Sequence, residues 1–527
     1  MLHECDVLVI GGGAAAMRAA VAAAQPDLRV ILVDKGEPGR SGTSPPGLHG
    51  IVTTLHPSDS EEALFGDIVR TGGDLNDYDL VRKAVHEATN EPARLEKIGL
   101  HFHRVRDGRY DVYRGDGHSV PHGLTFDAEE NGLNVVSVLA NEAWKRGVIL
   151  VERVMIMDLM VENGRIFGAR GIDLDENQQI FQAKAVVLAA GGANRIFPNV
   201  VPRIADEKYR TTGDAFVLAL RAGLNLVDME MANFRNSPPA SRLGARYINA
   251  KGNPFMTSYH PMGEHAPRGK VVEALYREMQ AGNGPIYMEI TPESERVAAF
   301  SPSEYKDYVK AYKAGQRPPI TITFQRLLGG AHIKDDASTA IEGLFVAGES
   351  AGGFHGGDRL QGAAFLETQV FGHLAGAGAA RCARRRQSEW HRGAQTAATC
   401  SGSARPATAS GATKASDCIH RVQEITWQHA GIVKDGQGLQ MALKEIGDIR
   451  RQIESGVSAA NAFEAIEASN LAIVAEAIVS ASLLRKETRA THSRSDFPMA
   501  DVGMERRHTS VRMQEMAFGA EFIACRD

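Results

Sequence analysis

Cysteine is too scarce in this sequence to build a metal centre or a disulfide framework. The chain has 527 residues and only five cysteines, at positions 5, 382, 400, 418 and 525. Their spacing fits neither a zinc site nor an iron-sulfur cluster, and it suggests no set of disulfides. We therefore expect no metal site, and we expect any iron-sulfur cluster that serves this protein to sit on another chain.

Excess positive charge and long apolar runs are also missing. The formal net charge is -5, which gives no basic surface for nucleic acid. We find no apolar run long enough to span a bilayer and no leader-like segment before the first expected strand. The sequence thus predicts a cytoplasmic protein without an integral membrane segment, and it leaves open peripheral association with a membrane through a partner. Hydrophobic residues make up 43% and charged residues 23%, and this composition and length predict two or three ordered domains.

The first motif is a glycine-rich turn between an expected strand and an expected helix. Residues 6–10 are aliphatic and β-branched, and a G-x-G-x-x-A pattern follows them at once. In this pattern Gly11 allows a tight turn, Gly13 lets the backbone approach a pyrophosphate, and Ala16 lets the helix pack closely on the strand. The helix N-terminus then offers N-H groups and a positive dipole to the phosphates.

An acidic residue follows the second expected strand. Residues 30–33 form a short aliphatic run, and Asp34 comes directly after it. It lies about twenty residues past the glycines, where a carboxylate can accept hydrogen bonds from ribose hydroxyls. Strand, turn, helix and acid together predict a Rossmann-type α/β fold that binds a dinucleotide. They do not separate NAD from FAD.

Several later segments decide between the two cofactors. They are G-R-S-G-T-S at 39–44, A-V-V-L-A-A-G-G at 185–192, T-G-D at 212–214 with R-A-G at 221–223, G-L-F-V-A-G-E at 343–349 and R-L-Q-G at 359–362. In this order they resemble the FAD-binding flavoprotein subunits of the succinate dehydrogenase and fumarate reductase superfamily, which includes L-aspartate oxidase and the α subunit of adenylylsulfate reductase. Residues 422–427 and 487–494 resemble the C-terminal helical part of the same flavoproteins.

The resemblance implies a set of FAD-binding residues. Glu349 matches the glutamate that binds the flavin ribityl chain, and Gly42 stands where membrane-bound relatives carry the histidine that is linked covalently to FAD. Glycine has no nucleophile, so we predict non-covalent FAD. The full expected set is Gly11, Gly13, Ala14, Ala15, Ala16, Asp34, Lys35, Ser41, Gly42, Thr43, Ser44, Gly47, Val154, Ala190, Gly191, Asp214, Gly348, Glu349, Arg359 and Ala364.

The same resemblance implies a domain plan. We expect a discontinuous FAD-binding domain at 1–232 and 336–384, with an inserted α+β capping domain at 233–335. A flexible linker rich in Ala, Gly, Ser and Thr is expected at 385–415, followed by a C-terminal helical domain at 416–527. Within the first part, Asn163 and Gly164 stand between alternating residues, which predicts a β-hairpin.

The catalytic residues are also implied by the resemblance. In the superfamily an arginine moves the proton that accompanies hydride transfer, and Arg268 takes its place here, although Gly269 replaces the aspartate that normally follows. Arg359 matches an arginine that clamps a substrate carboxylate, for which a guanidinium fork is well suited. His355 is a further candidate to line the flavin.

Both substrate histidines of the succinate and fumarate enzymes are missing. Arg235 and Gln325 stand in their places, and His332 is not a substitute for either. We therefore predict an FAD-dependent oxidoreductase that moves hydride between the flavin and a small anionic substrate other than succinate, and that exchanges electrons with a separate iron-sulfur subunit. The alternatives are a non-catalytic electron-transfer flavoprotein, against which the retained Arg268 and Arg359 argue, and an adenylylsulfate reductase-like subunit.

Overall fold

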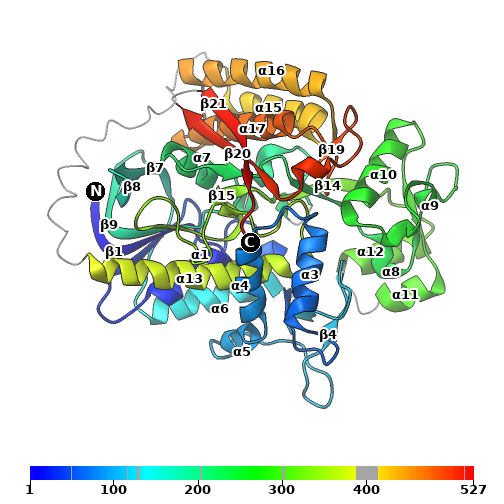
Figure 1. Cartoon of the computed structure of the whole chain (residues 1–527), viewed down its shortest axis with the longest axis horizontal. Helices are drawn as coiled ribbons and strands as arrows, with labels where there is room; N and C mark the ends of the chain where they lie inside the picture. The colour runs from blue at the N-terminus through cyan, green and yellow to red at the C-terminus, as the bar shows by residue number, and fades with distance from the viewer. Residues whose placement is uncertain are drawn as a thin grey trace.

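The computed structural model describes residues 1–527 except 49, 116, 128–130, 202–203, 299–302, 387–412 and 515–516. The chain forms a sheet-and-helix body, a lobe inserted to one side and a layer of helices above, as Figure 1 shows. Most of the predicted linker at 385–415 lies outside the described residues.

A mixed seven-stranded sheet forms the centre of the described body. Its order is β6-β2-β1-β9-β8-β7, and β16 pairs with β9. Strands β1, β2, β6, β9 and β16 pair in parallel, whereas β8 runs antiparallel to both of its neighbours, β9 and β7. The strands are β1 (Leu2–Ile10), β2 (Val30–Val33), β6 (Ile149–Val151), β7 (Val154–Glu162), β8 (Arg165–Asp173), β9 (Gln178–Leu188) and β16 (Leu344–Val346).

Helices pack against this sheet, and the glycine turn follows the carboxyl end of its central strand β1. The alanine-rich α1 (Ala14–Ala23) packs against α13 (Ala363–Arg385) and α6 (Asn131–Lys145). The small side chains allow this approach, because a Cβ at Gly376 of α13 would come 2.1 Å from the carbonyl oxygen of Ala19. The α/β fold predicted from the sequence is confirmed.

The hairpin predicted at Asn163 and Gly164 is present. It joins β7 to β8, and both turn residues have positive φ, 52° and 72°. Two consecutive left-handed residues are what a tight two-residue hairpin turn requires, and Asn-Gly adopts them readily.

A small layer of helices and a three-stranded sheet follows β2. The sheet has the order β3-β5-β4 among the described residues. Its elements are α2 (Ser44–Gly47), β3 (Gly50–Val52), α3 (Glu61–Thr71), α4 (Tyr78–Ala88), α5 (Glu91–Glu96), β4 (Val112–Tyr113) and β5 (Gly123–Thr125).

The inserted lobe (green in Figure 1) lies beside this body, on the opposite side from the N-terminus. Two-stranded sheets β11-β14 and β12-β13 support its helices. Helix α7 (Asp214–Arg221) and strand β10 (Leu226–Val227) precede it. The lobe holds β11 (Ala232–Ser237), α8 (Ala240–Leu243), β12 (Arg246–Ile248), α9 (Met256–Tyr259), α10 (Arg268–Gln280), β13 (Tyr287–Glu289), α11 (Pro292–Ala298), α12 (Ser303–Lys313) and β14 (Thr321–Leu327).

The C-terminal part contains more than helices. Its helices α15 (Ala415–Ala430), α16 (Gly436–Ser455) and α17 (Ala462–Leu484) pack on one another. They are followed by a hairpin of β20 (Arg507–Gln514) and β21 (Ala517–Ala524), which the sequence analysis did not predict. The hairpin extends a described sheet of order β17-β15-β10-β20-β21, with β15 (Gly330–His332) and β17 (Ala351–Gly352), while β18 (Val433–Lys434) pairs with β19 (Ser493–Arg494).

Helix α17 departs from the expectation that the sequence contains no apolar run long enough to span a bilayer. Among the described residues it alone is long and apolar enough to do so by length and composition. Most of its residues are buried against α15, α16, α7 and the β20-β21 hairpin. Its apolar surface is therefore part of the packed interior of this fold.

Candidate active site

Two adjoining cavities lie at the carboxyl ends of the parallel strands. The outer cavity, of about 870 Å³, runs along residues 33–37, 153–156 and 207–211 to α17. The inner cavity, of about 160 Å³, runs along the N-terminus of α1 to Glu349 and Arg359. Asp34, Ser41, Gly42, Ala190 and Thr211 line both, so the two form one elongated site.

The glycine turn brings the backbone to the wall of this site. Gly11 has φ +117°, and a Cβ there would lie 2.2 Å from the carbonyl oxygen of Ala189. A Cβ at Gly12 would lie 2.9 Å from the carboxyl group of Asp34. No larger residue fits either position, which explains the motif in steric terms.

The N-terminus of α1 faces the inner cavity with donors that suit a phosphate. Its first turn holds no acidic residue, and the backbone N-H of Ala14 donates to the hydroxyl of Ser44 over 3.1 Å. A helix N-terminus carries a partial positive charge, so a pyrophosphate placed here would be stabilised.

The acid after β2 is fixed by its own loop. Oδ1 of Asp34 accepts hydrogen bonds from the backbone N-H of Gly36 (2.7 Å) and from the hydroxyl of Ser41 (2.9 Å). Burial raises the pKa of Asp34, against the effect of these hydrogen bonds and of Lys35. Lys35 itself forms ion pairs with Asp214 (2.8 Å) and with Glu467 of α17 (2.7 Å), which link β2 to the C-terminal helices.

The inner cavity ends on a partly buried glutamate, Glu349, that has one buried oxygen without a hydrogen-bond partner. Glu349 follows β16, and its Oε1 has no hydrogen-bond partner. Burial raises the pKa of Glu349, although the nearby Arg326 favours its ionised form. A buried acceptor of this kind needs a donor, and ribityl hydroxyls of a bound flavin would supply it. The residues present therefore fit FAD.

Nearly every residue expected to bind FAD lines one of the cavities. The exception is Ala16, a fully buried residue of α1 that lines neither cavity. The residues on the walls are Gly11, Gly13, Ala14, Ala15, Asp34, Lys35, Ser41, Gly42, Thr43, Ser44, Gly47, Val154, Ala190, Gly191, Asp214, Gly348, Glu349, Arg359 and Ala364.

Four arginines from separate segments lie near one another, and of these Arg326 and Arg359 line the inner cavity whereas Arg235 and Arg268 line neither cavity. Arg235 lies on β11, Arg268 is the first residue of α10, Arg326 lies on β14, and Arg359 lies in the loop before α13. Burial and then the positive charges of Arg268 and Arg326 lower the pKa of Arg359 to about 9. This crowding of like charge would be relieved by an anion.

Polar neighbours orient two of these arginines. Nη2 of Arg359 donates to the side-chain oxygen of Gln325 over 3.3 Å, and both residues line the inner cavity. Arg326, which the sequence analysis did not single out, lies 3.4 Å from Glu367 of α13. Its only sequence signal was its place beside Gln325.

His355 lies behind the cavity wall rather than on it. It is buried, its Nε2 lies 3.0 Å from Glu367, and it lines neither cavity. Burial lowers the pKa of His355 to about 4, against the effect of Glu367. The expectation that His355 lines the flavin thus disagrees with its position, and its link to the site runs through Glu367 and Arg326.

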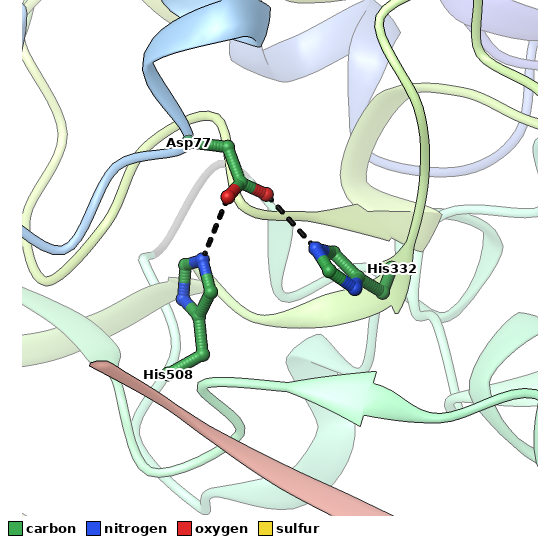
Figure 2. Close-up of side chains that lie close together, drawn as sticks. All are labelled: Asp77, His332 and His508. Atoms are coloured by element: carbon green, nitrogen blue, oxygen red, sulfur yellow. Dashed lines mark hydrogen bonds and ion pairs between the residues drawn. The ribbon is translucent and has the colours of Figure 1, made fainter. Parts of the chain in front are cut away.

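A second cluster of titratable side chains lies around Asp77, at the start of α4. Figure 2 shows its two oxygens directed toward His508 of β20 (3.2 Å) and His332 of β15 (3.0 Å). Burial disfavours the charge on Asp77, yet hydrogen bonds from both histidines hold its pKa well below the usual range. Arg526 also pairs with Asp77, over 2.9 Å.

These positive partners argue against a metal ion in the cluster. The ligand atoms of Asp77, His332 and His508 all lie within 4.8 Å of one another. However, His508 is held between Asp77 and Asp228, which raises its pKa well above the usual value despite burial. An imidazolium and the guanidinium of Arg526 already supply the positive charge that Asp77 requires. His332 therefore interacts with Asp77 in this cluster and is not part of the arginine group.

Comparison with known proteins decides the family. Residues 6–365 match the FAD binding domain model, and residues 419–521 match the model of the fumarate reductase flavoprotein C-term. The chain belongs to the fumarate reductase and succinate dehydrogenase flavoprotein family. It is an FAD-dependent oxidoreductase, as predicted.

Relatives of known name match along almost the whole chain. One is a subunit of the fumarate reductase (CoM/CoB) of Methanothermobacter marburgensis, which is 31% identical over 94% of this chain and 95% of its own. The flavoprotein subunit of the 8-methylmenaquinol:fumarate reductase of Wolinella succinogenes is 29% identical over 97% of this chain and 89% of its own.

Solved structures share the fold of this flavoprotein. A chain of E. coli quinol fumarate reductase superposes with a TM-score of 0.88 at 23% identity, covering 100% of this chain and 97% of that one. Adenylylsulfate reductase of Archaeoglobus fulgidus gives a TM-score of 0.78 at 20% identity, covering 99% and 96%.

Proposed function

We propose that this flavoprotein reduces a small unsaturated carboxylate, with the arginine group as its substrate site. The observation that carries the proposal is that Arg326 and Arg359 line the inner cavity, while Arg268 and Arg235 lie near enough to Arg359 to lower its pKa. Positive charge that burial and like neighbours destabilise is a site prepared for an anion. Relatives over most of the chain are named fumarate reductases, which supports fumarate as the first compound to test.

In this proposal the arginines have different roles: two bind the substrate and one donates a proton. Arg359, on the cavity wall beside Gln325, holds a carboxylate with its guanidinium fork, and Arg235 adds charge from β11. Bound FAD supplies hydride transfer. Arg268 donates the accompanying proton to the neighbouring substrate carbon, from the N-terminal end of α10.

Anaerobic reoxidation of the reduced flavoprotein tests this function. Fumarate or a related unsaturated acid should restore the absorbance of oxidised flavin, and enzymes typically turn over at about 10 per second. We expect succinate oxidation far below that rate, because Arg235 and Gln325 replace the paired histidines. Adenylylsulfate belongs in the same panel as the alternative substrate. Reoxidation by adenylylsulfate alone, or by no compound of the panel, would overturn the carboxylate proposal.

We also infer that the FAD is held without a covalent bond. Gly42 lines both cavities and presents no nucleophile to the flavin. Denaturation in acid should release the flavin into the supernatant. Flavin that remains with the precipitated and protease-digested peptide would contradict this.

A separate iron-sulfur protein is the proposed electron partner. The described cysteines Cys5, Cys382, Cys418 and Cys525 are unpaired and buried at scattered positions, which gives no cluster site within the described residues. The relatives from Methanothermobacter and Wolinella are both named as subunits, which supports a partner chain here. A purified single chain that is fully active with only oxygen or NAD(P)H would contradict the proposal.

A further inference from the structure

The loop between β17 and α13 carries Arg359 to the inner cavity, and it packs closely against its neighbours. Gly353 and Gly356 in this loop have positive φ, 95° and 60°. A Cβ at Gly353 would lie 2.5 Å from the carboxylate of Asp77, and one at Gly356 would lie 2.8 Å from the carbonyl oxygen of Gly72. No side chain fits at either glycine, so the path of the loop depends on the segments that surround it.

Residues 72–77 bind the loop from one side. Three hydrogen bonds between described residues join the two segments. They run from the N-H of Gly357 to the carbonyl of Gly72 (2.7 Å), from the N-H of Asp77 to the carbonyl of Gly353 (2.8 Å) and from Nδ2 of Asn76 to the carbonyl of Phe354 (2.8 Å). These bonds use the N-H of Gly357 and leave its carbonyl oxygen for another partner.

Thr491 of the C-terminal part is that partner. Its hydroxyl donates to the carbonyl oxygen of Gly357 over 2.7 Å, and its backbone N-H donates to the same oxygen over 3.2 Å. The next acceptor of the hydroxyl, Sδ of Met231, is 3.9 Å away. A carbonyl oxygen has two lone pairs, so one residue satisfies both of them at Gly357, two positions before Arg359.

The turn that presents Thr491 fits against the loop. Arg489 and His492 exchange two backbone hydrogen bonds of 2.9 Å, and Ala490 between them has φ 50°. A left-handed alanine is strained and persists where the surrounding structure fixes it. The methyl group of Ala490 lies against Gly357, where a Cβ would come within 2.6 Å of it. The turn therefore requires glycine at 357 and holds the loop at that point.

Arg359 has little else to fix its side chain. Among the described residues only Gln325 accepts a hydrogen bond from its guanidinium, over 3.3 Å, and its Nε is buried without a partner. A long side chain that is held by so few bonds takes its position from the backbone that carries it and from any anion that it binds.

We propose that Thr491 is a positioning residue for Arg359. The two hydrogen bonds from Thr491 fix Gly357 and thereby direct the guanidinium of Arg359 into the inner cavity. The inference rests on the proposed function, in which Arg359 holds the carboxylate. Thr491 lines neither cavity, so it acts through the loop and exchanges no atom with the substrate.

Removal of the hydroxyl tests this role without turnover. Thr491→Val keeps the shape of the side chain and loses one of the two hydrogen bonds to Gly357. Oxalate titrated into the holoenzyme and followed by flavin absorbance should bind about threefold to tenfold more weakly than to wild type, because the loop loses a hydrogen bond. KM for the identified acid should rise by the same factor with kcat nearly constant, and flavin content should stay unchanged. Thr491→Ala removes the same hydroxyl and takes the place of Thr491→Val if the valine enzyme is not soluble.

Two substitutions separate the hydroxyl from general stability. Thr491→Ser keeps the hydroxyl and loses the methyl group, so it should bind oxalate as wild type does. Thr488→Val is the matched control, since the hydroxyl of Thr488 donates to the carbonyl of Phe497 over 2.8 Å within the same C-terminal part. It should lower the midpoint of thermal unfolding at least as much as Thr491→Val and leave the Kd for oxalate unchanged. A rise in Kd for Thr488→Val or Thr491→Ser equal to that for Thr491→Val would overturn the inference.

A double-mutant cycle with Arg359→Lys shows whether Thr491 acts through Arg359. If it does, Thr491→Val should change the Kd for oxalate much less in the Arg359→Lys enzyme than in wild type. Effects of the two substitutions that simply multiply would overturn the inference, as would equal oxalate affinity of wild type and Thr491→Val, while the proposed function would stand. If wild type binds neither oxalate nor any acid of the panel, the proposed function fails and this inference fails with it.

Discussion

The two ends of the active site are built in different ways. At the dinucleotide end, glycine backbone and the N-terminus of α1 form the wall, from residues that follow one another in the sequence. At the proposed substrate end, the side chains of Arg235, Arg268, Arg326 and Arg359 come from four separate segments. The first end keeps the glycine motif and departs from the family pattern at Gly42, whereas the second departs from it at Arg235, Gly269 and Gln325.

This difference suggests that one end of the site binds the cofactor and the other end determines which substrate is accepted. Steric limits on backbone leave few solutions at the dinucleotide end, since a Cβ at Gly11 would lie 2.2 Å from Ala189. Long side chains at the other end can be exchanged without altering the fold. The same flavin scaffold can thus be kept while the anion it receives changes.

Gly11→Ala should have the largest effect, because it breaks the backbone of the dinucleotide end. Its Cβ would overlap Ala189, and φ is +117°. We expect purified protein without FAD, or none in soluble form, as measured by the ratio of flavin to protein absorbance. Gly315→Ala is the matched control, since it also has positive φ (+79°) but no atom within 4 Å of the new Cβ. It should cost about 1–2 kcal/mol of strain and keep its flavin.

Arg268→Lys should have the next largest effect, and only at the substrate end. A lysine keeps the charge but not the geometry of the guanidinium, so kcat should fall by roughly 10²-fold or more with flavin content unchanged. Steady-state kinetics with the identified acid would measure it. Arg277→Lys on the exposed side of the same helix, where Arg277 pairs with Glu273, should keep normal kcat. A variant at 268 that retains most of its kcat would remove this residue from the mechanism.

The sequence predicted the strand, glycine turn and helix that begin the α/β fold, for a physical reason. The residues of the glycine turn, 11–16, are contiguous, and their positions are determined by local backbone geometry, as with the hairpin at Asn163 and Gly164. Of the expected cofactor residues, Ala16 lies behind the wall, where its predicted packing role places it.

The substrate end and the C-terminal hairpin were harder to predict. Asn233 and Asp358 are far apart in the sequence and meet only through the fold, over 2.7 Å. His355 stands next to the arginine loop in sequence, yet its ring turns to Glu367. Strand β20 carries buried Thr509 and Val511, but its pairing with β10 depends on tertiary contacts.

Arg359→Lys should give a smaller effect of another kind. The site would lose a paired donor while keeping a cation, so binding should weaken by roughly 1–3 kcal/mol. We expect KM to rise while kcat changes little, since the interaction is present in both ground and transition states. Kinetics beside Arg268→Lys would distinguish the two arginines. A fall in kcat at constant KM for Arg359→Lys would contradict this division.

The smallest expected effect returns to the dinucleotide end and tests whether its side chains matter less than its backbone. Ser44→Ala removes the hydroxyl that accepts from Ala14 N-H over 3.1 Å at the start of α1. Bound phosphate can take over as acceptor, so the apoprotein should lose only about 0.5–1.5 kcal/mol of affinity for FAD, a few-fold rise in Kd. Titration of apoprotein with FAD measures it. Ser60→Ala is the matched control, because Ser60 accepts from Ala63 N-H over the same 3.1 Å at the start of α3 and lines neither cavity. It should lower the free energy of unfolding by about 0.5–2 kcal/mol without changing the Kd for FAD. Loss of FAD from Ser44→Ala as complete as from Gly11→Ala would show that this end depends on side chains as strongly as the arginine end does.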